Sequence, residues 1–235
     1  MINKTAVILA GGKGTRLYPY TVALPKPLVP VGDKPILEIM VIRLSQCGFK
    51  HIIITVNHQA DIVMAYMGDG AKWGVNIEYS LETKPLGTMG PLRLIKNLPD
   101  DFLVMNGDVL TDMDFAGFLD EHKAGGCIFS ISSHKRDQKN DYGVLEVSCD
   151  GKLSGFKEKP VTHYNVSMGV YAASKRILNY IPENEYFGFD GLMKELLDKK
   201  LDVCVIEHKG YWMDVGRPDD YAKATADVEN GVFEY

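Results

Sequence analysis

The sequence lacks the features that mark membrane-spanning, secreted or nucleic-acid-binding proteins. No apolar run approaches the roughly 20 residues that a membrane-spanning helix needs. Residues 1–5 lead into only a short apolar run before the first glycines, without the length or cleavage pattern of a signal peptide. The net charge of −5 disfavours nucleic-acid binding, which needs a clustered basic face. We expect no membrane or nucleic-acid partner, although a few cations can still focus positive potential on a small phosphate ligand.

Cysteine is scarce and irregularly placed. The four cysteines, Cys47, Cys127, Cys149 and Cys204, form neither a C-x-x-C metal site nor a recognisable disulfide framework. We therefore expect isolated thiols in a reducing compartment, and hence a cytoplasmic protein. None of the six histidines has a partner at catalytic spacing. We expect the histidines to be structural or on the surface.

The sequence does contain a regular alternation of short β-branched runs and helical patterns. The runs at 5–10, 51–56 and 101–105 are continuously apolar, as strands buried on both faces should be. Helical periodicity separates them, and no linker or repeat interrupts the 235 residues. This pattern predicts a single α/β domain over residues 1–235, with a Rossmann-like, mostly parallel sheet flanked by helices on both faces.

The texture changes after residue 133. Residues 143–147 and 151–157 are typical of two strands of a hairpin, with the turn at Cys149, Asp150 and Gly151. We therefore expect the second half of the chain to add a small β extension to the sheet.

The strongest motif is a glycine-rich loop at residues 9–17, L-A-G-G-K-G-T-R-L, directly after the first predicted strand. Glycines there let backbone N–H groups approach a phosphate chain closely. Arg16 adds a bidentate phosphate donor. Taken alone, the motif could equally be an ordinary glycine turn. It is neither a Walker loop nor the dinucleotide G-x-G-x-x-G, which disfavours a P-loop kinase or NTPase.

Lys26 lies between Pro25 and Pro27. The prolines restrain the backbone, so we expect Lys26 to be presented from a stiff, extended segment. A positioned ammonium beside a phosphate loop would stabilise the charge of phosphoryl-type transfer. The alternative is a solvated loop cation.

Two aspartates are candidate metal ligands. Asp108 ends the run N-G-D after a buried strand, at the edge where open α/β sheets bind ligands. A carboxylate there suits Mg²⁺, and the alternative is a solvent-facing turn. Asp214, in the run G-Y-W-M-D-V-G-R-P, is the expected partner carboxylate. The alternative for Asp214 is a helix cap, although Asp219 or Asp220 suits capping better.

The loop at 9–17 together with the P-K-P segment resembles the signature of the sugar-phosphate nucleotidyltransferases (nucleotide-sugar pyrophosphorylases), and the match continues through the whole chain. The resemblance implies that Mg²⁺ helps to couple an NTP with a sugar 1-phosphate, releasing pyrophosphate. It implies that Arg16 and Lys26 are catalytic and hold the phosphates, and that Asp108 and Asp214 bind the metal. The implied nucleotide-binding residues of the first half are Leu9, Ala10, Gly11, Gly12, Gly14, Thr15 and Asn106. Such a reaction needs no protein nucleophile or general base, because the sugar phosphate is already anionic at pH 7.

The second half resembles the family's sugar-phosphate side. Glu158 and Lys159 match an E-K-P motif in which the lysine grips the sugar phosphate and the glutamate takes sugar hydroxyls. Without the resemblance, this charged stretch would be interpreted as a solvated strand edge. Tyr142 and Gly143 match a glycine whose backbone meets the sugar, and Asn165 matches a hydroxyl partner. Residues 1–133 would then mainly bind nucleotide, and residues 134–235 mainly the sugar phosphate.

Base selection is expected in residues 82–90, through Glu82, Pro85, Gly87 and Thr88. The run P-L-G-T-x-G resembles the mannose-1-phosphate and heptose-1-phosphate guanylyltransferases more than the thymidylyltransferases, which usually carry Gln in place of Glu82. A glutamate would accept hydrogen bonds from guanine N1–H and N2–H₂. GTP and a mannose- or heptose-type sugar are favoured, while CTP and UTP stay open.

Two further expectations concern the whole protein. Because the sequence ends at Tyr235, we expect no C-terminal left-handed β-helix domain, which favours a less common surface sugar over mannose. A catalytically silent binding module is the alternative from another class. Such modules typically lose the loop arginine or the metal aspartates, and Arg16, Asp108 and Asp214 are all present. The sequence leaves the oligomeric state open, a homo-oligomer included.

Overall fold

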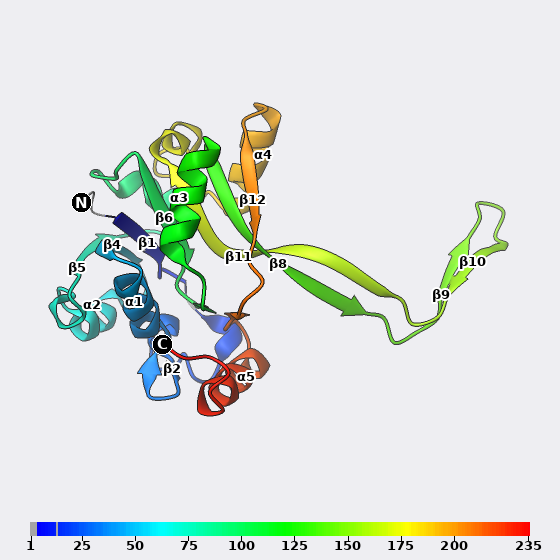
Figure 1. Ribbon diagram of the computed structural model, residues 1–235, viewed down its shortest axis with the longest axis horizontal. Coiled ribbons are helices and arrows are strands. Elements are labelled where there is room, and N and C mark those ends of the chain that lie inside the picture. Colours follow the sequence, from blue (N-terminus) through cyan, green and yellow to red (C-terminus); the bar gives the residue numbers. More distant parts are fainter. Residues whose placement is uncertain (1–3, 13) are drawn as a thin grey trace.

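The computed structural model describes residues 4–12 and 14–235, so Lys13 of the glycine-rich loop lies outside the described residues. A seven-stranded sheet forms the centre of the fold (Figure 1). Its strands, in order across the sheet, are β12 (Val203–Glu207), β8 (Phe129–Lys139), β11 (Val161–Ser174), β6 (Asp101–Asn106), β1 (Lys4–Leu9), β4 (Phe49–Val56) and β5 (Asn76–Leu81).

The sheet is mostly parallel, as the sequence predicts. The pairs β1–β4, β1–β6, β4–β5 and β8–β12 are parallel, and only β11 runs antiparallel to its two neighbours within the described sheet. In β1, Ala6 and Ile8 join one buried cluster and Val7 joins another. Because successive side chains of a strand point to opposite faces, the continuous apolar run reflects burial on both sides.

Helices cover both faces of the sheet, which confirms the predicted fold class. The α-helices are α1 (Ile36–Gln46), α2 (Ala60–Met67), α3 (Phe115–Gly125), α4 (Phe189–Asp198) and α5 (Pro218–Glu229). Buried residues of α1, α2, α3 and α5 belong to the cluster that contains Ala6 and Ile8. Those of α4, with the 3-10 helices Gly90–Leu94 and Lys175–Tyr180, belong to the cluster that contains Val7.

Small two-stranded sheets lie beside the main sheet. Strand β2 (Pro30–Val31) pairs with β3 (Lys34–Pro35), and β7 (Val109–Thr111) pairs with β13 (Trp212–Asp214). The second pair brings the chain near residue 214 back to the end of β6. No described helix has both the length and the apolar character needed to cross a membrane.

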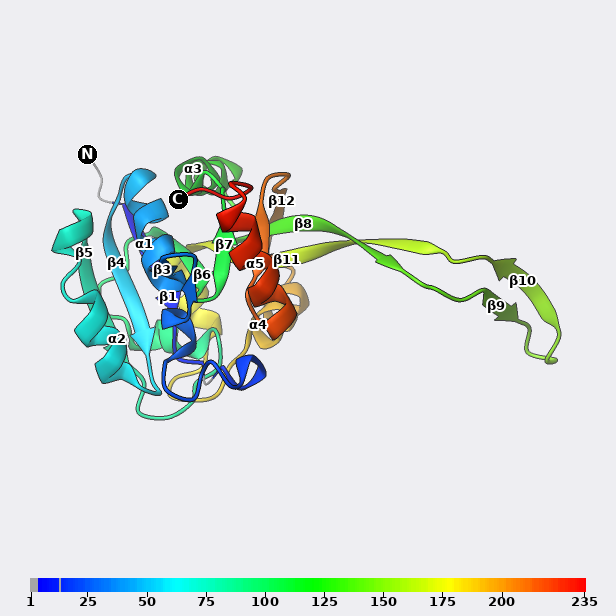
Figure 2. The ribbon, with the colours of Figure 1, turned by 90° about the horizontal axis from the view of Figure 1, so that it is seen from below.

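The β extension of the second half is a long projecting arm. Strands β8 and β11 stay paired well beyond the sheet, and β9 (Val144–Val147) with β10 (Leu153–Lys157) forms a hairpin at the far end (Figures 1 and 2). We call residues 134–167 the arm. The predicted hairpin is present, but it lies at the far end of this ribbon rather than against the sheet.

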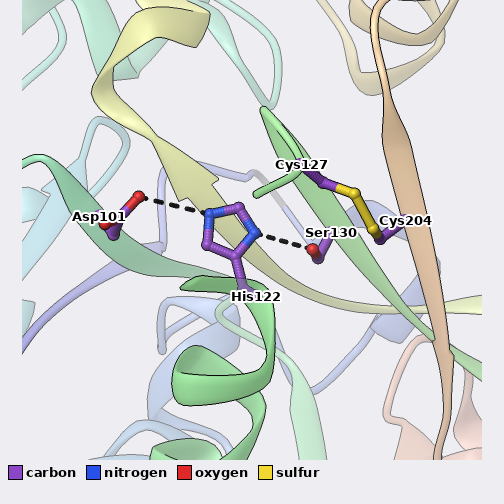
Figure 3. The surroundings of a disulfide bond; sticks show 5 residues. All are labelled: Asp101, His122, Cys127, Ser130 and Cys204. Carbon is purple, nitrogen blue, oxygen red and sulfur yellow. Dashed lines mark hydrogen bonds and ion pairs between the residues drawn. A yellow bond between two sulfur atoms is a disulfide. The ribbon is translucent and has the colours of Figure 1, made fainter. Parts of the chain in front are cut away.

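The prediction of four isolated thiols is wrong for two of the cysteines. Cys127 and Cys204 form a disulfide, whereas Cys47 and Cys149 are free (Figure 3). Cys204 lies in β12, and Cys127 lies just before its parallel neighbour β8, so strand pairing brings together residues 77 positions apart. Sequence spacing carried no signal of that pairing. Because disulfides are rare in reducing compartments, the cysteines no longer support the cytoplasmic expectation.

Candidate active site

A cleft of about 500 Å³ lies where β1, β4 and β6 end. These strands are parallel neighbours, so their carboxyl ends meet at one edge, where open α/β sheets bind ligands. Fourteen of the predicted site residues line the cleft: Leu9, Ala10, Gly11, Gly12, Gly14, Thr15, Arg16, Lys26, Glu82, Pro85, Gly87, Thr88, Asn106 and Asp108. The structure therefore brings the predicted nucleotide side together, while the role of each residue stays a prediction.

Gly14 determines how closely the glycine-rich loop approaches the segment around Lys26. Its φ of 63° lies in the left-handed region that favours glycine. A Cβ at Gly14 would lie 2.7 Å from the Cβ of Lys26 and 2.9 Å from Cγ2 of Thr21. A Cβ at Gly12, by contrast, would meet no described atom within 4 Å. The loop is therefore packed at Gly14 and open to a ligand at Gly12.

Lys26 is a buried cation rather than a solvated one. It begins the 3-10 helix Lys26–Leu28, so the prediction of an extended backbone at this lysine is wrong. Pro27 is tolerated in a first helical turn because its missing N–H has no partner to lose there, and the extended backbone lies on either side, at Pro25 and Val29. The Lys26 ammonium donates a hydrogen bond to Oδ2 of Asp108. The two side chains are only 11% and 18% exposed.

The two predicted metal ligands lie side by side although they are far apart in sequence. The β7–β13 ladder places Asp214 opposite Val109, and the Val215 N–H donates to the Asp108 carbonyl at 2.9 Å. Partial burial and then the negative charge of Asp108 raise the pKa of Asp214 to about 6, against the opposing charges of Lys26 and Arg16. Two adjacent carboxylates of this kind are stabilised by a bound cation.

The carboxylates of Asp108 and Asp214 fit a divalent cation that completes its coordination shell with water and phosphate oxygens. Oδ1 of Asp108 is buried and has no hydrogen-bond partner among the described residues, whereas buried polar atoms normally have one. The described part of the chain contains no group of three or more His, Cys, Asp and Glu side chains able to hold a metal. Mg²⁺ takes one or two carboxylates and keeps its other positions for water and substrate phosphates. Asp108 and Asp214 suit that requirement.

Glu82 lies buried against the glycine-rich loop. Its Oε2 accepts a hydrogen bond from the Leu86 N–H at 3.2 Å, and its side chain also bonds that of Asn57. Burial raises the pKa of Glu82. A Cβ on Gly11 would collide with Oε1 of Glu82. Glu82 therefore supports the loop, and part of its hydrogen-bonding capacity is already used.

The predicted sugar-phosphate residues lie on the arm instead of at the cleft. Tyr142 and Gly143 precede β9, and Glu158 and Lys159 follow β10. These four lie together, because a Cβ on Gly143 would approach Oε2 of Glu158 to 3.2 Å. Asn165 lies nearer the sheet, opposite Lys135.

None of these five lines the cleft as the described residues form it. The structure therefore places these five residues away from the cleft of their own chain. The physical reason is the continuous β8–β11 ladder, which carries them away from the sheet. Their binding of a sugar phosphate stays a prediction.

Several cleft residues were not identified from the sequence. They are Pro27, Thr55, Asn57, Leu86, Gly107, Tyr186 and Gly216. Thr55 faces Leu9 across β1 and β4, so the strand-end rule applied to β4 would have found it and Asn57. The Thr55 hydroxyl is buried without a hydrogen-bond partner among the described residues. Tyr186 lies just before α4, where no sequence signal marks it.

His122 forms a triad-like arrangement away from the cleft (Figure 3). Its Nδ1 lies 2.7 Å from Oγ of Ser130, and its Nε2 lies 3.5 Å from Oδ1 of Asp101. His122 and Ser130 are 1% and 0% exposed, so no substrate can reach the hydroxyl. Burial lowers the pKa of His122, which keeps the ring neutral. This histidine is structural, as the sequence suggested.

The chain resembles known proteins both in sequence and in structure. Residues 5–231 match the family model described as nucleotidyl transferase. The chain is 36% identical to the mannose-1-phosphate guanyltransferase of Yarrowia lipolytica, over 93% of this chain and 62% of that protein. It is 33% identical to the UTP–glucose-1-phosphate uridylyltransferase of a Synechocystis strain, over 95% and 63%. The chain therefore spans less than two thirds of the length of these relatives.

One solved structure matches the chain over nearly the full length of both proteins. The crystal structure of HddC from Yersinia pseudotuberculosis superposes with a TM-score of 0.75 at 27% identity, over 96% of this chain and 99% of that one. A second structure of that protein is a complex with GMP-PN. The matched range of the family model, residues 5–231, includes the central sheet, the glycine-rich loop and both aspartates, and we conclude that the chain belongs to the nucleotidyl transferase family.

Proposed function

We propose that this chain transfers a nucleoside monophosphate from an NTP to a sugar 1-phosphate and releases pyrophosphate. The observation that carries the proposal is the orphaned Oδ1 of Asp108, which lies beside Asp214 and in the cleft that the glycine-rich loop lines. An unpartnered carboxylate oxygen near a second carboxylate and an anion-binding loop is what a metal–nucleotide complex requires.

Each protein group has a defined task in this reaction. Backbone N–H groups at Gly11 and Gly12 and the guanidinium of Arg16 hold the triphosphate of the NTP. Asp108 and Asp214 hold Mg²⁺, which when bound neutralises charge on the phosphates. Lys26, buried beside Asp108, places a second positive charge at the same point.

The bond changes need no covalent enzyme intermediate. An oxygen of the sugar phosphate forms a bond to the α-phosphorus, and the bond from that phosphorus to the bridging oxygen of pyrophosphate breaks. Arg16 stabilises the charge that develops on pyrophosphate. Because the attacking oxygen is already anionic at neutral pH, no side chain has to remove a proton.

GTP is the proposed nucleotide and a mannose- or heptose-type sugar 1-phosphate the proposed acceptor. Support comes from the 36% identity to a mannose-1-phosphate guanyltransferase and from the GMP-PN complex of HddC. Glu82, with Oε1 facing Gly11 at the cleft, is the group proposed to accept from guanine. The 33% identity to a uridylyltransferase makes UTP the second candidate.

A pyrophosphate-release assay tests both parts of the proposal. Four NTPs are paired with a panel of sugar 1-phosphates, with and without Mg²⁺. The expected result is Mg²⁺-dependent release, highest for GTP with a mannose- or heptose-type sugar 1-phosphate. Preference for UTP would contradict the assigned base but not the reaction. Turnover of no pair would favour a silent binding module.

A further inference from the structure

The arm has no hydrophobic core of its own. None of residues 134–167, all of which the structure describes, is buried. The arm consists of a two-stranded ribbon and the β9–β10 hairpin, with solvent around both (Figures 1 and 2). Isolated two-stranded hairpins are at best marginally stable in water. A stable arm therefore needs a surface to pack against.

One face of the hairpin is apolar and uncovered. Val147 pairs with Leu153, and Leu145 pairs with Phe156, so the two pairs lie next to each other on one face of the hairpin. These four side chains are 62%, 65%, 59% and 56% exposed in the same order. A contiguous exposed apolar patch of this kind marks an interaction surface.

Exposed apolar side chains also lie close in sequence to cleft residues on the main body of the chain. Tyr18, Tyr20 and Val22 lie between the cleft residues Arg16 and Lys26, and all three are exposed. Tyr186 lines the cleft and is 74% exposed. Exposed apolar side chains therefore occur both on the arm hairpin and next to the cleft residues.

Charge also pairs the arm with the cleft. Residues 134–167 carry six lysines and arginines against five acidic residues, which gives the arm a net charge of +1. Because the whole chain has a net charge of −5, the rest of the chain has a net charge of −6. Among the described residues that line the cleft, Arg16 and Lys26 are the only lysines and arginines, and Lys26 is already paired with Asp108. A site for two phosphorylated substrates needs further positive charge, and Lys159 on the arm can supply it.

The arm does not reach the cleft of its own chain. Its two strands are paired without a break from the pair Ser133 and Ser167 at the base to the pair Lys139 and Val161 farther out. Lys159 lies just beyond, where the Asn140 N–H bonds the Pro160 carbonyl. At about 3.3 Å per residue, the paired stretch alone spans roughly 20 Å, and Lys159 lies beyond its far end. Lys159 also has a φ of 41°, a left-handed conformation that is unfavourable before proline and is typical of functional positions.

From these observations we infer that the arm of one copy packs on a second copy of this chain and brings Glu158 and Lys159 to that copy's cleft. Each chain has one arm and one cleft, so a two-fold axis satisfies both at once. Each active site is then built from two chains, one that binds the nucleotide and one that binds the sugar phosphate. The sugar-phosphate role rests on the proposed function, whereas the exchange of arms does not.

The first test is the mass of the protein in solution, measured by light scattering at micromolar concentration. The wild type is expected at about twice the 26.1 kDa of one chain. A shortened arm, in which an Asn-Gly turn replaces residues 135–165, is expected to be monomeric. The double variant Leu153→Ser, Phe156→Ser, which keeps the whole arm, is expected to be mostly monomeric as well. The exposed Lys152→Ala at the hairpin tip is the matched control and should stay dimeric.

The second test asks which chain supplies the arm. Asp108→Asn and Lys159→Ala are each expected to be inactive alone. When the two are mixed in equal amounts and allowed to exchange chains, half of the dimers are mixed and one of their two sites is intact, which restores about a quarter of wild-type activity. If the arm served its own chain, both kinds of site would stay defective and mixing would restore nothing.

The outcomes separate this inference from the proposed function. A monomeric wild type, or a shortened-arm variant that is still dimeric, overturns the exchange of arms. A dimer that depends on the arm but turns over no NTP and sugar 1-phosphate pair upholds the exchange and contradicts the function. An active wild type whose mixed variants recover nothing contradicts the two-chain site.

Discussion

The ammonium of Lys26 occupies one oxygen of the Asp108 carboxylate, Oδ2, and leaves the other, Oδ1, buried without a partner among the described residues. A buried carboxylate that is only half satisfied is costly for the fold. Such a cost is typical of a site that awaits a ligand.

Arg16 is expected to act on the leaving pyrophosphate. Replacing it with alanine removes a charge-assisted donor from an exposed 3-10 turn, so the fold should be unaffected. Turnover should fall by a factor on the order of 10²–10⁴, the scale for electrostatic stabilisers of a transition state. Steady-state kinetics and thermal melting measure the two effects. The matched control is Arg217→Ala, an exposed arginine just before α5, and an equal loss in that variant would contradict the specific role of Arg16.

Asp214 is expected to destabilise the metal-free protein. Its pKa is raised from 3.8 to about 6, so the folded state binds this proton more tightly than the unfolded state. The unfavourable charge is fully present above pH about 6 and is relieved as the pH falls toward 4. In EDTA at pH 7.5, Asp214→Asn should therefore melt about 2–4 °C above the wild type.

The pH dependence supplies the check on this prediction. The difference in melting temperature should shrink as the pH falls through 6, because the wild-type carboxyl then takes up its proton. Asp202→Asn, at an exposed position outside the cleft, serves as the matched control and should show no such trend. A melting temperature of Asp214→Asn at or below that of the wild type at pH 7.5 would contradict the account.

Two glycines of the loop should respond differently to alanine. At Gly14 the positive φ and the contact with Lys26 make a Cβ unfavourable, so Gly14→Ala should lose about 1–3 kcal/mol of stability. At Gly12 a Cβ meets no described atom, so Gly12→Ala should keep its stability and raise the KM for the NTP. Urea unfolding and kinetics distinguish the two, and an equal loss of stability in both variants would contradict the packing described.

The Cys127–Cys204 disulfide is expected to stabilise the fold without affecting the reaction. It closes a loop over a sequence separation of 77 residues and lies away from the cleft residues. Reduction, or the change Cys204→Ser, should cost about 2–4 kcal/mol of stability and leave turnover unchanged. Thermal melting with and without reductant measures this, with Cys47→Ser as the control. If thiol labelling of the native protein found Cys127 entirely as a free thiol, the disulfide would be ruled out.

Local sequence patterns predicted the part of the site that local chain geometry builds. The glycine-rich loop and Asp108 each follow a buried apolar strand, and the edge rule for parallel sheets places both at one cleft. The position of Asp214 depends on the β7–β13 pairing, which joins distant segments and leaves no sequence signature. Only its resemblance to a family motif identified it.

The arm shows why the other part could not be predicted. Alternating charged and apolar residues at 143–157 indicate a hairpin whether it lies on a sheet or projects into solvent. What decides between the two is the continuous β8–β11 ladder, a pairing between distant segments. The grouping of Gly143, Glu158 and Lys159 was therefore predictable, but their distance from the cleft was not.

Pyrophosphate release by the wild type and by Asp108→Asn, measured with GTP and mannose- or heptose-type sugar 1-phosphates, tests the central claim most directly. The wild type is expected to show Mg²⁺-dependent release, and the variant a loss on the order of 10²–10⁴. Asp112→Asn, just after β7 and outside the cleft, should retain activity. Full activity of Asp108→Asn, or release that does not depend on a divalent cation, would contradict it.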